Sequence, residues 1–118
     1  MIVDHIAIRA KDIKKVASWY EETLGAVVSH TDKYYIRLTM ENTTIAIIDE
    51  KKYPHRHIGV LVDSYDDLPK EGLRVEHRDG TVGVYTVDPE GNMTEFIYYT
   101  DDLKPQFVTY GYTKPNSQ

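Results

Sequence analysis

Apolar and polar side chains alternate over residues 2–9, which is the pattern of a β-strand with one buried face. Residues 12–24 change to a helical period, with large apolar side chains three or four positions apart: Val16, Trp19, Tyr20 and Leu24. Asp12 is typical of a helix N-cap and Gly25 of a helix end. The chain is therefore predicted to begin with a strand and one amphipathic helix, with Trp19 and Tyr20 in the core.

Three runs rich in β-formers follow the helix, at residues 26–30, 34–40 and 43–49. Short polar turns separate them. The segment 51–56 is polar, contains Pro54 and has no periodicity, so it is predicted to link two halves of the molecule. The first half then has the order β-α-β-β-β.

The second half repeats this order with a weaker helix. Residues 57–63, 75–78, 82–88 and 93–100 are predicted strands. The segment 64–72 is short, and Pro69 would interrupt a helix that extended through it, so a turn or two is expected there. Residues 101–118 mix aromatic and polar side chains, and three readings stay open: a packed tail, a lid or an interface strand.

The repeat also appears in the residues themselves. The sequence His-Ile-Ala-Ile at 5–8 matches His-Ile-Gly-Val at 57–60. At a similar offset Tyr35 matches Tyr85, and Asn-Thr-Thr-Ile at 42–45 matches Asn-Met-Thr-Glu at 92–95, which aligns Ile45 with Glu95. We therefore expect an α+β fold of two tandem β-α-β-β-β modules, about 2–50 and about 56–100, with the second helix shortened. Both modules would lie in one domain spanning 1–118, because 118 residues suit a single core.

Composition narrows the functional classes. The chain is 41% hydrophobic and 28% charged and has no apolar run of the roughly 18 residues that a membrane helix needs. It begins without the pattern of a secretory signal and contains no cysteine, so we expect a cytoplasmic protein without thiolate metal sites. A net charge of −5 without a strong basic cluster argues against nucleic-acid and membrane partners, leaving a small-molecule substrate or a protein partner.

Two histidines occupy equivalent places in the repeat. Residues two apart in a strand share a face, so His5 lies beside Ala7, and His57 beside Gly59, on the side away from the core. The small neighbours leave room for a pocket. Glu95 is in mid-strand among apolar residues, where a carboxylate without a partner would be costly to bury.

A cation would remove that cost. Two imidazoles and one carboxylate hold divalent first-row metals while leaving positions open for water or substrate. We therefore predict a metal site at His5, His57 and Glu95. Ile45, at the position matched with Glu95, has no ligating group, so three protein ligands are expected and not four.

Other interpretations of these residues remain open. Glu95 could pair with Arg37 or Arg9 instead of a metal. His55 shares strand parity with His57 and could ligate in its place. The remaining histidines are expected on the surface: His30 and His77.

The duplicated modules, the paired histidines His5 and His57, and an Asp-Pro-Glu-Gly-Asn turn at 88–92 followed by Glu95 resemble the vicinal oxygen chelate superfamily. Its members include glyoxalase I, methylmalonyl-CoA epimerase, extradiol dioxygenases, fosfomycin-resistance thiol transferases and metal-free bleomycin-binding proteins. The resemblance covers about residues 2–100. It implies a curved, cup-like mixed sheet, one divalent ion (Fe, Mn, Zn, Ni or Co) and a homodimer.

The resemblance also implies roles for aromatic and basic residues. Tyr85 matches a tyrosine that touches substrate in the fosfomycin-resistance and extradiol branches, so it is the candidate catalytic residue, although packing is the competing role. Three further residues are candidate substrate contacts: Tyr35, Arg37 and Tyr99. Glyoxalase I and the epimerase resemble the chain less closely, because they use a carboxylate at the position assigned here to Ile45.

Three functions compete at this point. The first is a small metal-dependent lyase, thiol transferase or dioxygenase acting on an oxygen-rich substrate, which the His-His-Glu set favours. The second is a metal-free protein that sequesters a small drug-like ligand. The third is a ferredoxin-like regulatory module, β-α-β-β-α-β, but three predicted strands after the first helix argue against it.

Overall fold

The protein is described by a computed structural model that covers residues 1–77 and 80–99. Within these residues, one helix, α1 (Ile13–Leu24), and one short 3-10 helix, η1 (Tyr65–Asp67), accompany eight strands. The strands are β1 (Ile2–Ala10), β2 (Val27–Thr31), β3 (Tyr35–Thr39), β4 (Thr44–Asp49), β5 (His57–Leu61), β6 (Leu73–Glu76), β7 (Val82–Val87) and β8 (Met93–Tyr98). The predicted α+β fold with a shortened second helix is confirmed.

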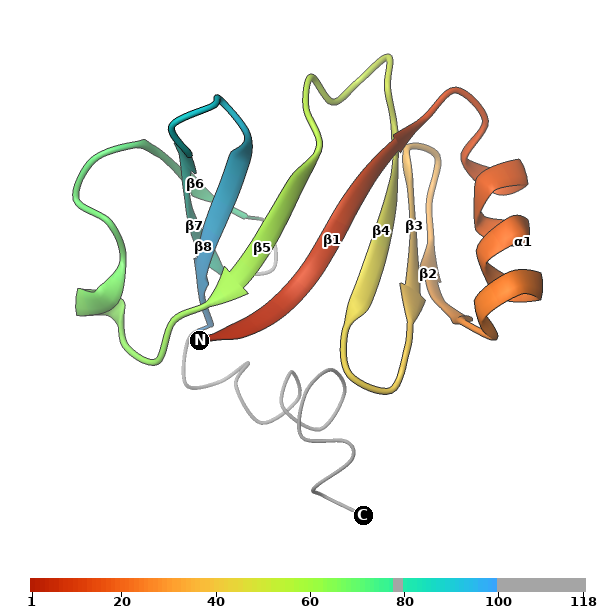
Figure 1. Cartoon of the computed structure of the whole chain (residues 1–118), viewed down its shortest axis with the longest axis horizontal. Helices are drawn as coiled ribbons and strands as arrows, with labels where there is room; N and C mark the ends of the chain where they lie inside the picture. The colour runs from red at the N-terminus through yellow and green to blue at the C-terminus, as the bar shows by residue number, and fades with distance from the viewer. Residues whose placement is uncertain (78–79, 100–118) are drawn as a thin grey trace.

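The eight strands form one curved mixed sheet in the order β2-β3-β4-β1-β5-β8-β7-β6 (Figure 1). β1 pairs with β4, and β5 with β8, in parallel, while the other neighbours are antiparallel. The two modules, β1–β4 and β5–β8, meet through β1 and β5. There Ile6 faces Ile58, His5 faces Gly59 and Ala7 faces His57, as a local two-fold axis through the Ile6–Ile58 pair requires. The predicted equivalence of the two histidines is confirmed.

The register corrects one prediction about the repeat. Glu95 pairs with Gly59, and Ala46 pairs with Ala7, the residue equivalent to Gly59. The counterpart of Glu95 is therefore Ala46, and the assignment of Ile45 is wrong by one position. One position turns a strand side chain to the opposite face, and Ile45 is indeed buried in the core beneath α1. Alanine has no ligating group either, so the expectation of three protein ligands does not change.

The helix α1 has the predicted ends. The side chain of Asp12 accepts a hydrogen bond from the backbone N–H of Lys15 at 3.1 Å, and Gly25 ends the helix at φ 69°. Trp19, expected in the core, is 55% exposed. At about 100° per residue it lies roughly 120° around the helix from Ile13, which faces the sheet.

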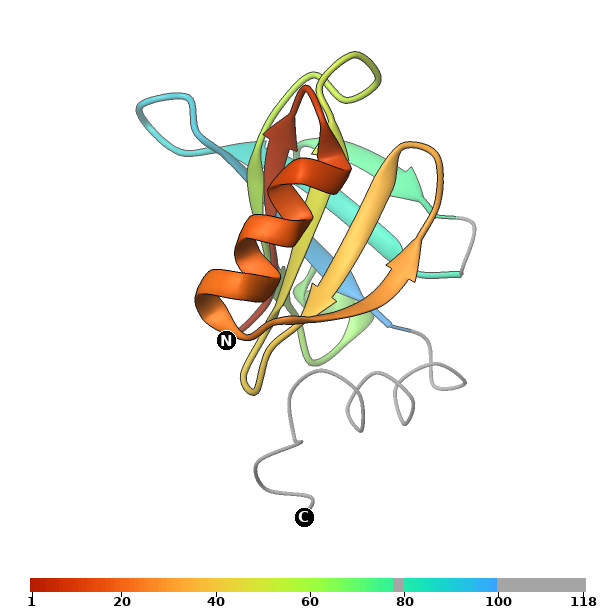
Figure 2. The ribbon, with the colours of Figure 1, turned by 90° about the vertical axis from the view of Figure 1, so that its right-hand side faces the viewer.

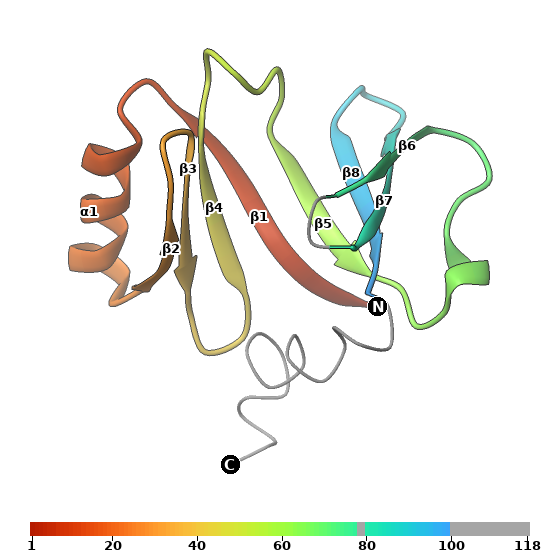
Figure 3. The ribbon, with the colours of Figure 1, turned by 180° about the vertical axis from the view of Figure 1, so that it is seen from behind.

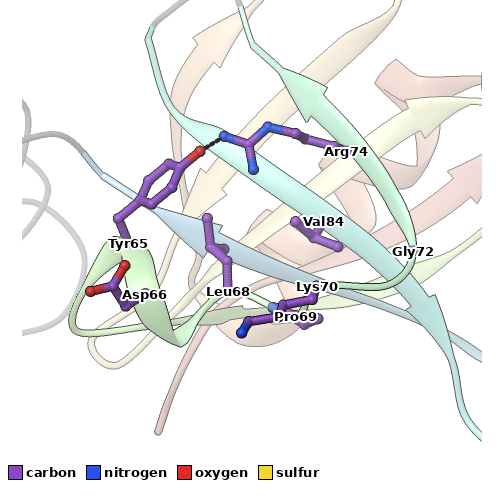
Figure 4. A pocket seen from close by; sticks show the side chains of 8 residues that line it. All are labelled: Tyr65, Asp66, Leu68, Pro69, Lys70, Gly72, Arg74 and Val84. Atoms are coloured by element: carbon purple, nitrogen blue, oxygen red, sulfur yellow. Dashed lines mark hydrogen bonds between the residues drawn. The ribbon is translucent and has the colours of Figure 1, made fainter.

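The two modules are covered unequally on their outer faces. α1 lies over the first module (Figures 2 and 3), and the core beneath it includes Ile13, Ala17, Ile36, Leu38, Ile45 and Ile47. The second module has a smaller core around Val62, Leu68 and Val84. Beside this core a hollow of about 290 Å³ opens between η1 and β6, with Tyr65, Leu68 and Arg74 on its wall (Figure 4). The short second helix thus leaves the second module thinly covered.

Parts of the sequence prediction fall outside the described ranges. These are the ends expected at residues 78 and 100 and the segment 101–118. In the ranges 1–77 and 80–99, no helix is both long and apolar enough to cross a membrane.

Candidate metal centre

Three side chains from neighbouring central strands converge on the face of the sheet opposite α1: His5 from β1, His57 from β5 and Glu95 from β8. The Nε2 atoms of the two histidines share a hydrogen bond of 2.9 Å, and each lies 3.4 Å from Oε1 of Glu95. The exposed fractions of the side chains are 14% for His5, 10% for His57 and 2% for Glu95. The three predicted ligands therefore form one buried cluster.

The spacing of these atoms suits a single metal ion. Nitrogen and oxygen ligands about 2.1 Å from one ion, at angles of roughly 90–109°, lie about 3.0–3.4 Å apart. The two separations of 3.4 Å fall within that range, and the separation of 2.9 Å is just below it. Two imidazole nitrogens and one carboxylate oxygen are also a donor set that Fe, Mn, Zn and similar ions accept. The cluster could hold a divalent metal.

Two glycines give the cluster its room. A Cβ atom placed on Gly59 would collide with the imidazole of His5, which faces it across the β1–β5 pair. A Cβ atom on Gly83, in β7, would collide with Oε2 of Glu95. Both positions therefore require glycine because a Cβ atom would collide with His5 or Glu95. Their backbone does not require it, since neither Gly59 nor Gly83 has a positive φ.

A third histidine belongs to this cluster, and the sequence prediction missed it. His77 was expected on the surface, and its side chain is 32% exposed, but its Nε2 donates to Oε2 of Glu95 at 2.7 Å. It follows β6 in a polar stretch, so periodicity does not single it out. The one available signal was the buried carboxylate itself, because such a group needs several donors. The two oxygens of Glu95 thus have separate partners, with His77 on Oε2.

An acidic residue supports His5 from behind. Nδ1 of His5 donates to Oδ2 of Asp4 at 2.6 Å. The hydroxyl of Tyr99, a predicted substrate contact, donates to Oδ1 of the same carboxylate at 3.1 Å. Tyr99 therefore contacts the carboxylate behind the cluster.

Electrostatics reinforce this arrangement. Burial alone would lower the pKa of His5, but hydrogen bonds to Asp4 and Glu95 and the charge of both carboxylates raise it to about 9. Burial lowers the pKa of His57, and the nearby positive charge of His5 lowers it further, against the opposing pull of Glu95. Burial would raise the pKa of Glu95, but hydrogen bonds from His5, His57 and His77 hold it far below its usual range. The carboxylate is ionised and available to a cation.

Tyr85 lies directly beside the cluster. It pairs with Glu95 across β7 and β8, and its ring is 5.3 Å from that of His57. Burial and the charge of Glu95 raise its pKa, so the hydroxyl keeps its proton. His55 packs its ring at 5.3 Å from Tyr85 and 5.4 Å from His57. His55 therefore lines the site, while His57 supplies the ring nitrogen to the cluster.

The remaining candidates lie on the first module. Arg9 donates from Nε to the carbonyl of Tyr53 and from Nη2 to the carbonyl of Glu50, both at 2.9 Å, so it ties down the linker and does not pair with Glu95. The other two lie on β3, four strands from β8. Nε of Arg37 donates to the hydroxyl of Ser29 at 3.2 Å, and the ring of Tyr35 lies 5.2 Å from that of His30.

One known protein family matches most of the chain. The profile of the Glyoxalase/Bleomycin resistance protein/Dioxygenase superfamily matches residues 2–102. No curated protein matches the chain.

Solved structures are similar over nearly their whole length. One is a hypothetical protein from Bacillus halodurans C-125, with a TM-score of 0.64 and 17% identity over 84% of this chain and 94% of that one. A superfamily member from Vibrio splendidus 12B01 has a TM-score of 0.59 and 13% identity over 80% and 96%. Methylmalonyl-CoA epimerase from Mycobacterium tuberculosis has a TM-score of 0.64 and 14% identity over 87% and 91%. At these identities the likeness establishes the fold alone.

Proposed function

Since the chain belongs to the glyoxalase/bleomycin resistance protein/dioxygenase superfamily, we propose that it is a small metal-dependent enzyme whose single divalent ion is held by His5, His57 and Glu95. The observation that carries the proposal is the convergence of these three ligand atoms, within 3.4 Å of one another, from strands of both modules. A bound ion of this kind supplies Lewis acidity toward two neighbouring oxygens of a substrate. The candidate ions are Fe, Mn, Zn, Ni and Co.

The residues of the chain would then bind and orient the substrate. Tyr85 is the candidate catalytic residue. It is protonated and adjacent to Glu95, and it would donate a hydrogen bond to a substrate oxygen. His55, packed against Tyr85, would narrow the site on the same side. Tyr35 and Arg37 on β3 would contact the far end of a longer substrate across the first module.

The donor set bears on the reaction class. The two-fold repeat makes Glu95 and Ala46 equivalent, so this pair of positions provides one carboxylate and not two. Epimerisation removes a proton from one face of a carbon atom and returns a proton to the opposite face, so it would need a second acid–base group there. We therefore favour lyase, thiol-transfer or dioxygenase chemistry on a small oxygen-rich molecule over epimerisation, and we expect a homodimer.

Metal analysis tests the proposal. Protein purified without chelators is expected to contain about one divalent ion per chain, and His5→Ala and Glu95→Ala variants about none, because three ligands are the minimum for this kind of site. Arg74→Ala, beside η1 and away from the cluster, is the matched control. Wild-type protein that binds no divalent ion above the variants would rule out the enzyme. Turnover assays with Fe(II) and a catechol under anaerobic loading, and with Mn(II) and a thiol, then divide the reaction classes.

A second candidate is a metal-free protein that sequesters a small aromatic ligand. The contact of three flat rings, His55, His57 and Tyr85, supports it, because such faces pack well against an aromatic ligand. This candidate predicts that ligand binding is insensitive to chelators and to Glu95→Ala.

A further inference from the structure

β1 contains a bulge directly before the first ligand. Val3 faces Val60 and His5 faces Gly59, so Asp4 is an extra residue with no partner position on β5. In a regular strand Asp4 would point away from His5, since neighbours alternate between faces. The bulge instead allows its carboxylate to reach the ring of His5, with Oδ2 2.6 Å from Nδ1.

The bulge is held from two sides. The backbone carbonyl of Asp4 accepts from the hydroxyl groups of Thr43 at 3.3 Å and Thr44 at 3.1 Å. Its carboxylate accepts from the hydroxyl of Tyr99 at 3.1 Å. Asp4 is only 4% exposed, and a carboxylate buried to that extent is stable only with such donors. The aspartate is therefore fixed at both its backbone and its side chain.

The second histidine has no comparable support. Arg56 precedes His57 and is exposed, and the strand pairing of β5 with β8 is regular. Nδ1 of His57 is buried, and within the part of the chain that the structure describes it has no hydrogen-bond partner. The bulge and its aspartate thus serve one ligand of the pair and not the other.

We infer that Asp4 is a positioning residue for the metal centre. By accepting the Nδ1–H of His5, it fixes the ring so that Nε2 faces His57 and Glu95 as a ligand atom. Partners of this kind orient metal-binding histidines and make them better ligands. The metal part of the inference rests on the proposed function, whereas the orientation of the ring does not and can be measured in the metal-free protein.

The experiment compares Asp4→Ala, Asp4→Asn and the surface control Asp66→Asn. In metal-free protein labelled with nitrogen-15, the Nδ1–H of His5 should give a downfield, slowly exchanging resonance, assigned by its absence in His5→Gln. Asp4→Ala should lose this resonance and bind Zn(II) or Mn(II) about 10–100-fold more weakly. Asp4→Asn retains an acceptor oxygen, so it should keep the resonance and lose less affinity. Asp66→Asn should change neither.

The outcomes separate the two proposals. A resonance that persists in Asp4→Ala, or a metal affinity that stays within about twofold of wild type, overturns the role of Asp4. A resonance lost in Asp4→Ala, in a protein whose wild type binds no metal, supports the orientation of His5 and overturns the proposed function. If Asp4→Ala does not fold, Asp4→Asn and Tyr99→Phe supply the comparison. A metal affinity within about twofold of wild type in both variants would then count against the inference.

Discussion

The first module buries its outer face beneath the twelve residues of α1, whereas the second has only η1 and the loop after it. Leu38 and Ile47 are fully buried in the first core, while Leu68 and Val84 form the thinner second core beside an open hollow. The cluster of His5, His57 and Glu95 lies where the modules meet, on the opposite face. The two halves of the sheet can therefore differ in their covering helices and still bring these three side chains together in a common register.

The modules also differ in what they give to the cluster. The first contributes His5, backed by Asp4, and the second contributes His57 and Glu95 together with His77. The two histidines are thus placed symmetrically, whereas the side chains that contact them differ between the modules. Four sets of substitutions test that asymmetry.

The core substitutions should have the largest effect. Ile47→Ala, beneath α1, is expected to lower the free energy of unfolding by about 3–4 kcal/mol, and Leu68→Ala, beneath η1, by about 2 kcal/mol. The first site cannot collapse around the cavity as readily as the second, which lies beside a hollow. Urea denaturation measures both. Equal losses in the free energy of unfolding would show that α1 and η1 stabilise their modules equally.

Exchanging the small residues at the two-fold axis should come next. Gly59→Ala is expected to weaken metal binding at least about 100-fold and to destabilise the protein by about 1–3 kcal/mol, because the added methyl group meets the ring of His5. Ala7→Gly, the equivalent position in the first module, should cost about 1 kcal/mol and leave metal affinity nearly unchanged. Titration with a competing chelator measures affinity. A Gly59→Ala protein with wild-type metal affinity would contradict the close packing of Gly59 against the ring of His5.

His77→Ala should have a smaller effect on the metal. Losing the donor to Oε2 leaves Glu95 less firmly oriented, so affinity is expected to fall about tenfold. His30→Ala, on the exposed surface of the first module, is the matched control and should have no effect. The same chelator titration applies. A metal affinity of His77→Ala equal to that of His30→Ala would show that His77 does not orient Glu95.

The pH dependence of stability is the subtlest comparison. In metal-free protein the pKa of His5 is raised to about 9, so its stabilisation is fully present below its ordinary value near 6.5 and is lost as pH rises through about 9. The pKa of His57 is lowered, so it acts in the opposite direction and costs stability in acid. Urea midpoints in chelator should fall between pH 7 and 9, and His5→Gln should flatten that slope. A rising midpoint over this range would refute the assignment.

Much of the fold was predictable from sequence. Hydrophobic period and end signals located α1 between Asp12 and Gly25 and located the eight strands of residues 1–77 and 80–99, with β6 displaced. The repeated His-Ile dipeptide correctly paired His5 with His57. Glu95 was recognisable because a carboxylate within an apolar strand requires a partner.

The residues around these ligands were not predictable, for one shared reason. Local periodicity fixes which face a side chain takes within its own strand, but register against a neighbour is set by the whole sheet, and one position reverses the face. Aligning the residues of the two halves thus assigned Ile45 as the counterpart of Glu95, whereas the pairing of the strands assigns Ala46. The bulge that turns Asp4 toward His5, and the hairpin that returns His77 to Glu95, exist only through contacts between distant segments. The sequence by itself determined the three candidate ligands and the equivalence of the two histidines, and the tertiary structure alone decided what orients them.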